Sequence, residues 1–254
     1  MDHISMEMLS FLLGVGFVAA FIDSVVGGGG LISMPALLMT GLPPSVVLGT
    51  NKLASICCSS TSSISFLRSG KMDLGLVKYL FPLSLIGSIL GAYTVKLIPS
   101  ESLKPLVVVM LILVAIYTVF KKDWGDESTY KGINKRAGVL GGCAAFILGF
   151  YDGFFGPGAG TFLIFVFLTL GFDFVVAAGN AKALNLASNL GAVAIFMLGS
   201  SVNYIYGFSM GIAMIIGAIA GSRFAIAKGA TYVKPLFILV TTLLIGKQLL
   251  DILH

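Results

Sequence analysis

The chain contains little charge. Of its 254 residues, 11% are Asp, Glu, Lys or Arg, 57% are hydrophobic, and the mean hydropathy is +1.01. An average soluble domain carries about 25% charged residues, so the polar surface here is too small to cover a water-soluble globule of this length. Apolar runs such as Leu103–Phe120 approach the roughly 20 residues that cross a bilayer. The shortage of charge therefore excludes a soluble domain and predicts an all-α integral membrane protein.

Histidine and cysteine are also scarce, which limits the chemistry available inside the protein. The two histidines, His3 and His254, are terminal, so the apolar segments hold no Ser/His triad and no histidine-based metal site. The three cysteines, Cys57, Cys58 and Cys143, lie in apolar stretches without the spacing of metal ligands. We therefore expect no disulfide, no metal and no cofactor.

Two short enzyme-like patterns lack the context that would give them meaning. Residues 207–211 match the nucleophile elbow, and residues 14–19 match a dinucleotide-binding fingerprint. Neither follows a strand in an α/β pattern, so we interpret both as accidents of glycine-rich helices. The net charge of +5 does not indicate nucleic acid either, because the basic residues lie between apolar segments rather than in one patch.

Glycine, by contrast, is abundant, and its most informative pattern occurs twice. Four glycines at 27–30 follow Asp23 at the end of one apolar run, and the sequence GPGAG at 156–160 follows Asp152 at the end of another. A very apolar chain with Gly/Pro interruptions at matching places in its two halves is typical of a secondary transporter built from internal repeats.

The match between the halves continues downstream at an offset of 130 residues. The sequence TNK ending at Lys52 corresponds to NAK ending at Lys182; other matched pairs are Gly41 with Gly171, Gly87 with Gly217, Gly91 with Gly221, and residues 104–106 with 234–236. The glycines spaced by four also fit small-xxx-small helix contacts. We divide the chain into a first membrane repeat (1–120), a polar cytoplasmic linker (121–136) and a second membrane repeat (137–254).

Each repeat is expected to contain a short apolar segment after its glycine break. The expected segments are Met8–Ile22, Leu31–Thr40, Ser45–Leu67, Leu74–Ile98 and Ser102–Phe120 in the first half, and Ala137–Tyr151, Thr161–Leu170, Phe174–Leu198, Tyr204–Ala227 and Tyr232–Leu253 in the second. As a helix, Leu31–Thr40 covers only about half of the hydrocarbon core. It forms either a broken helix or a re-entrant hairpin with its glycine tip at mid-depth. The broken helix gives four membrane crossings per half and parallel repeats, and the hairpin gives three crossings and inverted repeats.

The basic residues favour inverted repeats. In that arrangement the linker and the loops 68–78 and 222–234 share one side of the membrane and carry eleven of the 16 lysines and arginines, against three on the other side. Because basic residues collect on the cytoplasmic side, these loops are predicted to be cytoplasmic and both termini to be outside. The predicted fold is a polytopic helical bundle of two inverted repeats, each with a Gly-tipped re-entrant or broken helix.

The two glycine tips are the first candidate for a binding site. A short helix begins after each tip, and the free N–H groups of a helix start attract anions. One tip alone would be read as a tight turn, but two tips entering from opposite sides would meet at one central site. The candidate substrate-binding residues here are Gly28, Gly29, Gly30, Leu31, Gly158, Ala159, Gly160 and Thr161.

Lys52 and Lys182 are the next candidates, since both lie within the first two turns of long apolar helices. Charges inside membranes usually mark substrate or ion paths, although a lysine at this depth can also snorkel to the surface. Their recurrence in both halves favours substrate binding. Asp23 and Asp152 could pair with these lysines, cap the tips or carry protons, and the sequence leaves all three roles open.

Other polar side chains recur near the two lysines at about one helix turn. Asn51 and Asn185 are candidate substrate-binding residues, and further possible donors are Asn180, Asn189, Ser55, Ser59 and Ser63. For each of them taken singly, an interhelical hydrogen bond is an equally good interpretation.

With these residues in place, the pattern resembles the TauE/SafE family of sulfite-exporter-like permeases. The matching segments are IDSVVGGGGL (22–31), GTNK (49–52), SGKMD (69–73), GFYDGFFGPG (149–158) and AKALN (181–185), and the likeness covers nearly the whole chain. The resemblance implies transmembrane movement of sulfur-containing or organic anions such as sulfite, thiosulfate or sulfonates. Asn180 stands where the first half has Thr50, so the two half-sites are not expected to be chemically equal.

These observations predict a secondary transporter of small anions that works by alternating access around the central site. The alternatives are an intramembrane enzyme and a scaffold subunit, but the sequence offers neither His/Cys catalytic sites nor extended soluble surfaces for them. The expected partners are a small anionic substrate and the lipid bilayer, with the inner or plasma membrane as the location. A homodimer is left open.

Overall fold

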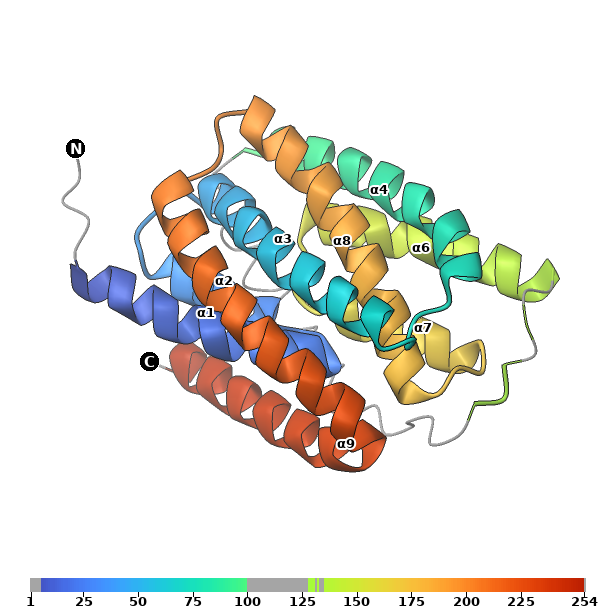
Figure 1. Ribbon diagram of the computed structural model, residues 1–254. Helices are drawn as coiled ribbons and strands as arrows, with labels where there is room; N and C mark the ends of the chain where they lie inside the picture. Colours follow the sequence, from blue (N-terminus) through green and yellow to red (C-terminus); the bar gives the residue numbers. More distant parts are fainter. Residues whose placement is uncertain (1–5, 100–127, 131, 133–134, 254) are drawn as a thin grey trace.

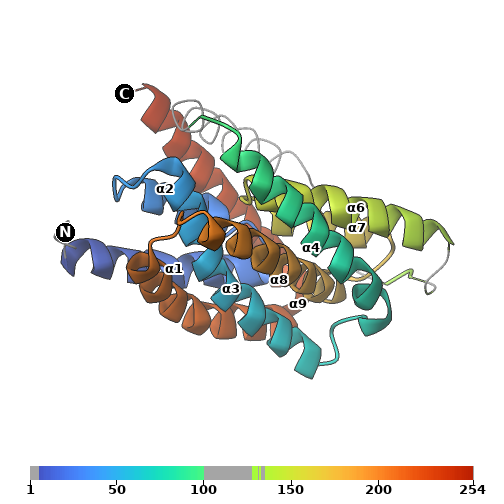
Figure 2. The same ribbon diagram turned by 90° about the horizontal axis from the view of Figure 1, so that it is seen from above.

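In its described part, which covers residues 6–99, 128–130, 132 and 135–253, the computed structural model consists of helices joined by loops and contains no strand (Figures 1 and 2). Side chains are described up to residue 229, except those of 135–137. The helices are α1 (Met6–Val26), α2 (Gly30–Leu38), α3 (Pro44–Arg68), α4 (Leu74–Lys96), α6 (Lys135–Phe154), α7 (Ala159–Thr169), α8 (Phe174–Leu198) and α9 (Tyr204–Leu253). The span predicted at 102–120 and most of the linker lie outside the described residues.

Four stretches are long and apolar enough to cross a membrane, which confirms the all-α membrane class. They are Met6–Val26, Leu74–Lys96, Phe174–Leu198 and Tyr204–Gly229. Helix α3 is as long as α8, at 25 residues, but it is more polar and lies in the middle of the bundle against α8 and α9 (Figure 1). Its polar residues Thr50, Asn51 and Lys52 are buried, so this polarity faces protein.

The glycine breaks are shorter than the sequence predicted. Asp23 and Asp152 both lie within helices, α1 and α6, and neither begins a break. The backbone leaves helical geometry at Gly27 and Gly28, with φ of 77° and 82°, and near Gly158, with φ of 83°. These positions, together with Gly156 at φ of 103°, need glycine's access to positive φ, whereas an aspartate is compatible with the last turns of a helix.

Close glycine contacts join helices of different halves. A Cβ added at any of the four matched glycines would overlap the backbone of the helix that faces it: Gly87 and Gly91 of α4 lie against Phe146 and Phe150 of α6, and Gly217 and Gly221 of α9 lie against Phe17 and Phe21 of α1. The small-xxx-small contacts predicted for these two pairs are therefore confirmed. The α4–α6 and α1–α9 interfaces are equivalent, because the residues in them correspond between the halves.

Helices α3 and α8 are also equivalent, and they lie side by side in opposite directions (Figure 1). Gly49 near the start of α3 lies against Ser201 beyond the end of α8, and Gly179 near the start of α8 lies against Lys71 beyond the end of α3. Midway, Asn189 Nδ2 is 3.4 Å from Ser59 Oγ, and these two residues occupy the same position in the two halves. The contact therefore joins two residues that are separated by the same 130-residue offset as the other matched pairs.

The described end of the linker packs on the loop before α8. The Thr129 amide donates to the Gly171 carbonyl at 2.7 Å, and the Tyr130 ring stacks on Phe172 with ring centroids 3.8 Å apart. Burial, with the nearby Asp73 carboxylate, raises the pKa of Tyr130. The linker, the loop before α4 and the loop before α8 therefore lie at the same end of the bundle.

Candidate functional site

Two ion pairs connect the halves at the centre of the protein. Lys52 Nζ lies 2.6 Å from Asp152 Oδ1, and Lys182 Nζ lies 2.6 Å from Asp23 Oδ2. In each pair the lysine comes from one half and the aspartate from the other. Lys52 and Lys182 are 2% and 0% exposed, so neither lysine snorkels to a surface.

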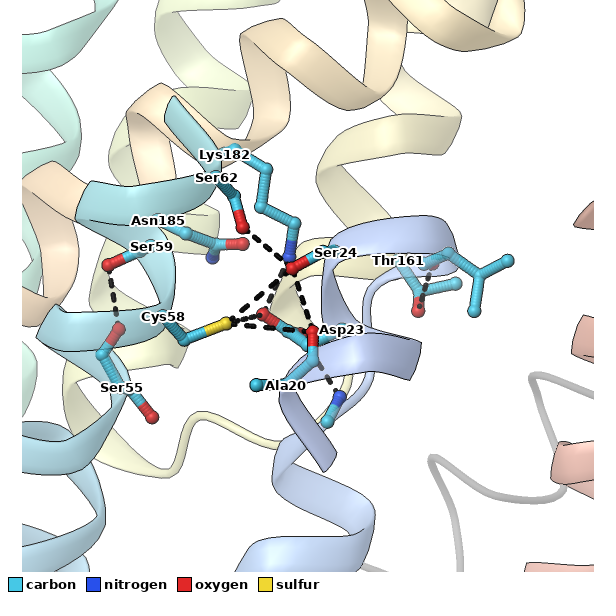
Figure 3. A network of polar contacts seen from close by, with 12 residues as sticks. Ala20, Asp23, Ser24, Ser55, Cys58, Ser59, Ser62, Thr161, Lys182 and Asn185 are labelled. Carbon is cyan, nitrogen blue, oxygen red and sulfur yellow. Dashed lines mark hydrogen bonds and ion pairs between the residues drawn. The ribbon is translucent and has the colours of Figure 1, made fainter. Parts of the chain in front are cut away.

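Asp23 combines two of the roles that the sequence left open. Oδ2 pairs with Lys182, while Oδ1 accepts the amide N–H of Gly29 at 3.0 Å and so fixes the first tip. This position near the end of α1 lets the carboxylate reach forward over the break to the start of α2. Figure 3 shows Lys182 reaching Asp23 from α8 and the Cys58 thiol pointing to the same carboxylate from α3, at 3.5 Å.

Asp152 is held by stronger donors than Asp23. It accepts from Lys52, from Asn185 Nδ2 at 3.3 Å and from the Ser188 hydroxyl. Ser188 occupies the position that Cys58 occupies in the first half, so the same contact is made by a hydroxyl in one half and by a thiol, a weaker donor, in the other. The side chain of Asp152 is 5% exposed and that of Asp23 is 22% exposed.

The two glycine tips touch each other. A Cβ added at Gly27 would lie 2.4 Å from the backbone nitrogen of Thr161, and one added at Gly30 would lie 3.0 Å from Pro157 Cα. The Thr161 hydroxyl also donates to the Val26 carbonyl at 3.2 Å. No room is left for a side chain at Gly27, and a Cβ at Gly30 would already be tight, which explains why both positions are glycine.

A small polar cavity of about 40 Å³ lies between the tips and the ion pairs. It is lined by most of the predicted site residues: Asp23, Gly28, Gly29, Gly30, Asn51, Lys52, Asp152, Gly158, Gly160 and Asn185. Leu31, Ala159, Thr161 and Lys182 are close by but do not line it. The volume accommodates only a few water-sized groups, since one water needs roughly 10–15 Å³ by this measure.

The sequence reading missed Ser33, Cys58 and Gly156 among the residues that line this cavity. The Ser33 hydroxyl donates to Asn51 Oδ1 at 2.6 Å, so this residue orients a predicted one. Cys58 lies one to two turns beyond Lys52 on α3, and helical spacing from Lys52 could have identified it.

Several polar groups near the lysines have partners within the protein. The amides of Gly29, Leu31 and Ala159 bond within the tips. Among the described residues, the cavity-lining amides of Gly30 and Gly160 have no such backbone partner. Lysine ammoniums, glycine amides and the Asn185 amide form a set of donors suited to an oxyanion.

Thr50 and Asn180 lie outside this cavity. Thr50 Oγ1 accepts the amide N–H of Asn203, and Asn180 Oδ1 accepts that of Asp73, both at 2.8 Å. Thr50 thus binds the loop before α9 and Asn180 the loop before α4, in each case in the opposite half. The difference between threonine and asparagine affects how these loops are held, and it does not make the cavity asymmetric.

The chain is similar to proteins described as membrane transporters. The family model for sulfite exporter TauE/SafE matches residues 12–247. A probable membrane transporter protein, ORF9 of a Sinorhizobium species, is 38% identical over 100% of this chain and 97% of its own length. A probable membrane transporter protein of Haemophilus influenzae is 36% identical over 98% and 97% of the two chains. Escherichia coli YfcA, with the same description, is 35% identical over 98% and 92%.

No solved structure matches the chain. The matched stretch nevertheless extends over both halves and spans the positions of both glycine tips and both ion pairs. An apolar bundle of helices with a charged centre agrees with their description. The chain belongs to the TauE/SafE family of membrane transporters.

Proposed function

We propose that the protein is a secondary transporter that moves small anions, namely sulfite or other sulfur-containing or organic anions, across the cell membrane. The observation that carries the proposal is the small polar cavity between two touching glycine tips, lined by Lys52 and by amides of Gly30 and Gly160 that have no backbone partner among the described residues. Intramembrane ionisable residues are rare and mark substrate or ion pathways. All of these donors favour a negatively charged ligand.

The size and electrostatics of the cavity support a small oxyanion. A volume of about 40 Å³ suits a group of a few heavy atoms, and a larger organic anion would need the tips to separate. Because the surroundings have a low dielectric constant, attraction between an anion and a lysine ammonium is stronger here than in water. The lysines are held by carboxylates, so the anion would replace a carboxylate as partner rather than meet a free charge.

The place where the halves meet supports alternating access. The ion pairs, the tips and the contact between Ser59 and Asn189 all lie between the two halves, so a rotation of one half against the other would change all of them together. The antiparallel directions of α3 and α8, and the linker packed at the end of the bundle where α4 and α8 begin, support inverted repeats with that end in the cytoplasm.

Transport by the purified protein in liposomes tests the proposal. Uptake of sulfite, thiosulfate, a small sulfonate and a small carboxylate is measured against protein-free liposomes, and uptake of at least one of them is expected. Lys182→Met should strongly reduce uptake at substrate concentrations near half-saturation of the unaltered protein. Lys78→Met removes an exposed lysine near the start of α4 and should not. Absence of uptake of every anion would reject the proposal in favour of a scaffold or an intramembrane enzyme.

A further inference from the structure

The central site is electrically balanced before any substrate enters. Lys52 and Lys182 supply two positive charges, and Asp23 and Asp152 supply two negative ones. An anion that entered this arrangement would add an uncompensated charge in a region of low dielectric constant, which is strongly unfavourable. The site therefore needs a positive charge to enter with each anion, or a negative one to be removed.

We propose that this charge is a proton and that Asp23 binds it, so that the protein couples anion movement to proton movement. The proposal rests on the proposed transport function and specifies its coupling ion. Of the two buried carboxylates, Asp23 is the one that water reaches, since its side chain is 22% exposed and that of Asp152 is 5% exposed.

The groups around Asp23 also favour it as the proton acceptor. The titratable groups that face it are Lys182 from α8 and the Cys58 thiol from α3. Lys52 and Asp152 line the same cavity as Asp23. Helix α2 and the residue before it contribute glycine amides and Ser33 to the cavity wall, and the described part of α9 contributes only the uncharged Met214. A thiol stabilises a neighbouring carboxylate anion less than the Ser188 hydroxyl stabilises Asp152.

The proton-binding step conserves charge and atoms. A hydronium ion from the aqueous side gives its proton to Asp23 Oδ2, leaves a neutral water molecule, and so converts the carboxylate to a neutral carboxylic acid. Lys182 remains an ammonium, loses its charged partner and becomes the partner of the entering anion. One proton and one monovalent anion enter together, so this movement carries no net charge across the membrane, and the Lys52–Asp152 pair stays intact.

The identity of residue 58 provides a test of this assignment. Replacing the thiol by a hydroxyl, Cys58→Ser, gives Asp23 the donor that Asp152 already has and should stabilise its anion. The pH at which transport is half-maximal should then fall by about half to one unit, the size expected for one improved hydrogen bond to a charged group. Cys57→Ser is the matched control, because Cys57 faces Gly211 of α9 and does not line the cavity.

The experiment uses the full chain in liposomes, with sulfite and a small sulfonate as probes and an internal pH-sensitive dye. With an interior one pH unit more alkaline than the outside, the wild type should accumulate a transported monovalent anion about tenfold and acidify the interior. A membrane voltage alone should change accumulation little. Protein-free liposomes control for leakage of the neutral, protonated probe across the bilayer. The sulfonate avoids this leakage, because it remains ionised.

The outcomes separate the two proposals. Uptake that follows a sodium gradient, or that is indifferent to the pH gradient, would overturn proton coupling while leaving transport established. No uptake under any gradient would overturn both. Asp23→Asn should abolish accumulation driven by the pH gradient, and accumulation by this variant would overturn the role of Asp23. If Asp23→Asn does not fold, the Cys58→Ser variant provides the test. An unchanged pH of half-maximal transport in that variant would contradict the assignment of the proton to Asp23.

Discussion

Removing the charge of Lys52 should destabilise the protein more than removing that of Lys182. The variant Lys52→Met keeps the length of the side chain but leaves Asp152, which is only 5% exposed to solvent, without its cationic partner. Breaking a buried ion pair by deleting one partner costs about 3–5 kcal/mol, because the remaining charge is uncompensated. At about 2–4 °C per kcal/mol for a chain of this size, the unfolding temperature should fall by roughly 6–20 °C.

The second ion pair provides an internal comparison. Lys182→Met leaves Asp23, which is 22% exposed and still accepts the Gly29 amide, so water offsets part of the loss and the drop should be smaller. The double variant Lys52→Met/Asp152→Asn removes both charges of the first pair. It should recover much of the stability lost in Lys52→Met, because no unpaired charge remains.

Thermal unfolding of the purified protein in detergent measures these differences, as the fraction that stays monodisperse after heating. Lys78→Met, which removes an exposed lysine near the start of α4, controls for the general loss of a positive charge. The reasoning would be refuted if Lys52→Met unfolded at the same temperature as Lys78→Met, or if Lys182→Met were the less stable of the two paired-lysine variants.

The remaining predictions concern transport and topology. Lys52→Ala and Lys182→Ala should each raise the half-saturating substrate concentration about ten- to a hundredfold, because a charge-assisted contact contributes roughly 1.5–3 kcal/mol; unchanged concentration dependence in both would contradict this. Gly29→Val should abolish substrate binding, since its Cβ would lie 2.6 Å from a backbone carbonyl oxygen of α1. Gly158→Val should do so through its φ of 83°, and normal substrate affinity in either valine variant would refute the tip site. Ser128→Cys in a cysteine-free background should be labelled only from the cytoplasm, and labelling from outside intact cells would reject the inverted topology.

Much of the fold could be predicted from the sequence because the bilayer imposes strong constraints. Apolar length identified the spans, and the predicted segment Phe174–Leu198 coincides with α8. The limits of the breaks were less predictable. The pattern began each break at an aspartate, but Asp23 and Asp152 remain helical, and only backbone conformation distinguishes the last helical residue from the first non-helical one.

The composition of the central site was predictable, but its connections were not. Recurrence at matched positions drew attention to Lys52, Lys182, Asp23 and Asp152, since a duplicated charge within an apolar chain is costly unless it has a partner. Which lysine meets which aspartate depends on how the halves cross, and Lys52 and Asp152 are 100 residues apart. The partner of Asn180 could not be predicted either. Its side chain accepts the Asp73 amide N–H, and this contact depends on where the loop before α4 lies.

The exchange of partners between the halves has an evolutionary consequence. If the repeats are inverted as proposed, two identical half-length chains in opposite orientations would form both ion pairs from a single lysine and a single aspartate each, and the fused chain would correspond to an antiparallel dimer of related units. After fusion, selection acts on each pair separately, and the compensating change for a substitution lies in the other half of the gene. Across the family, position 52 should therefore covary with position 152, and position 182 with position 23, rather than with the carboxylate of the same half.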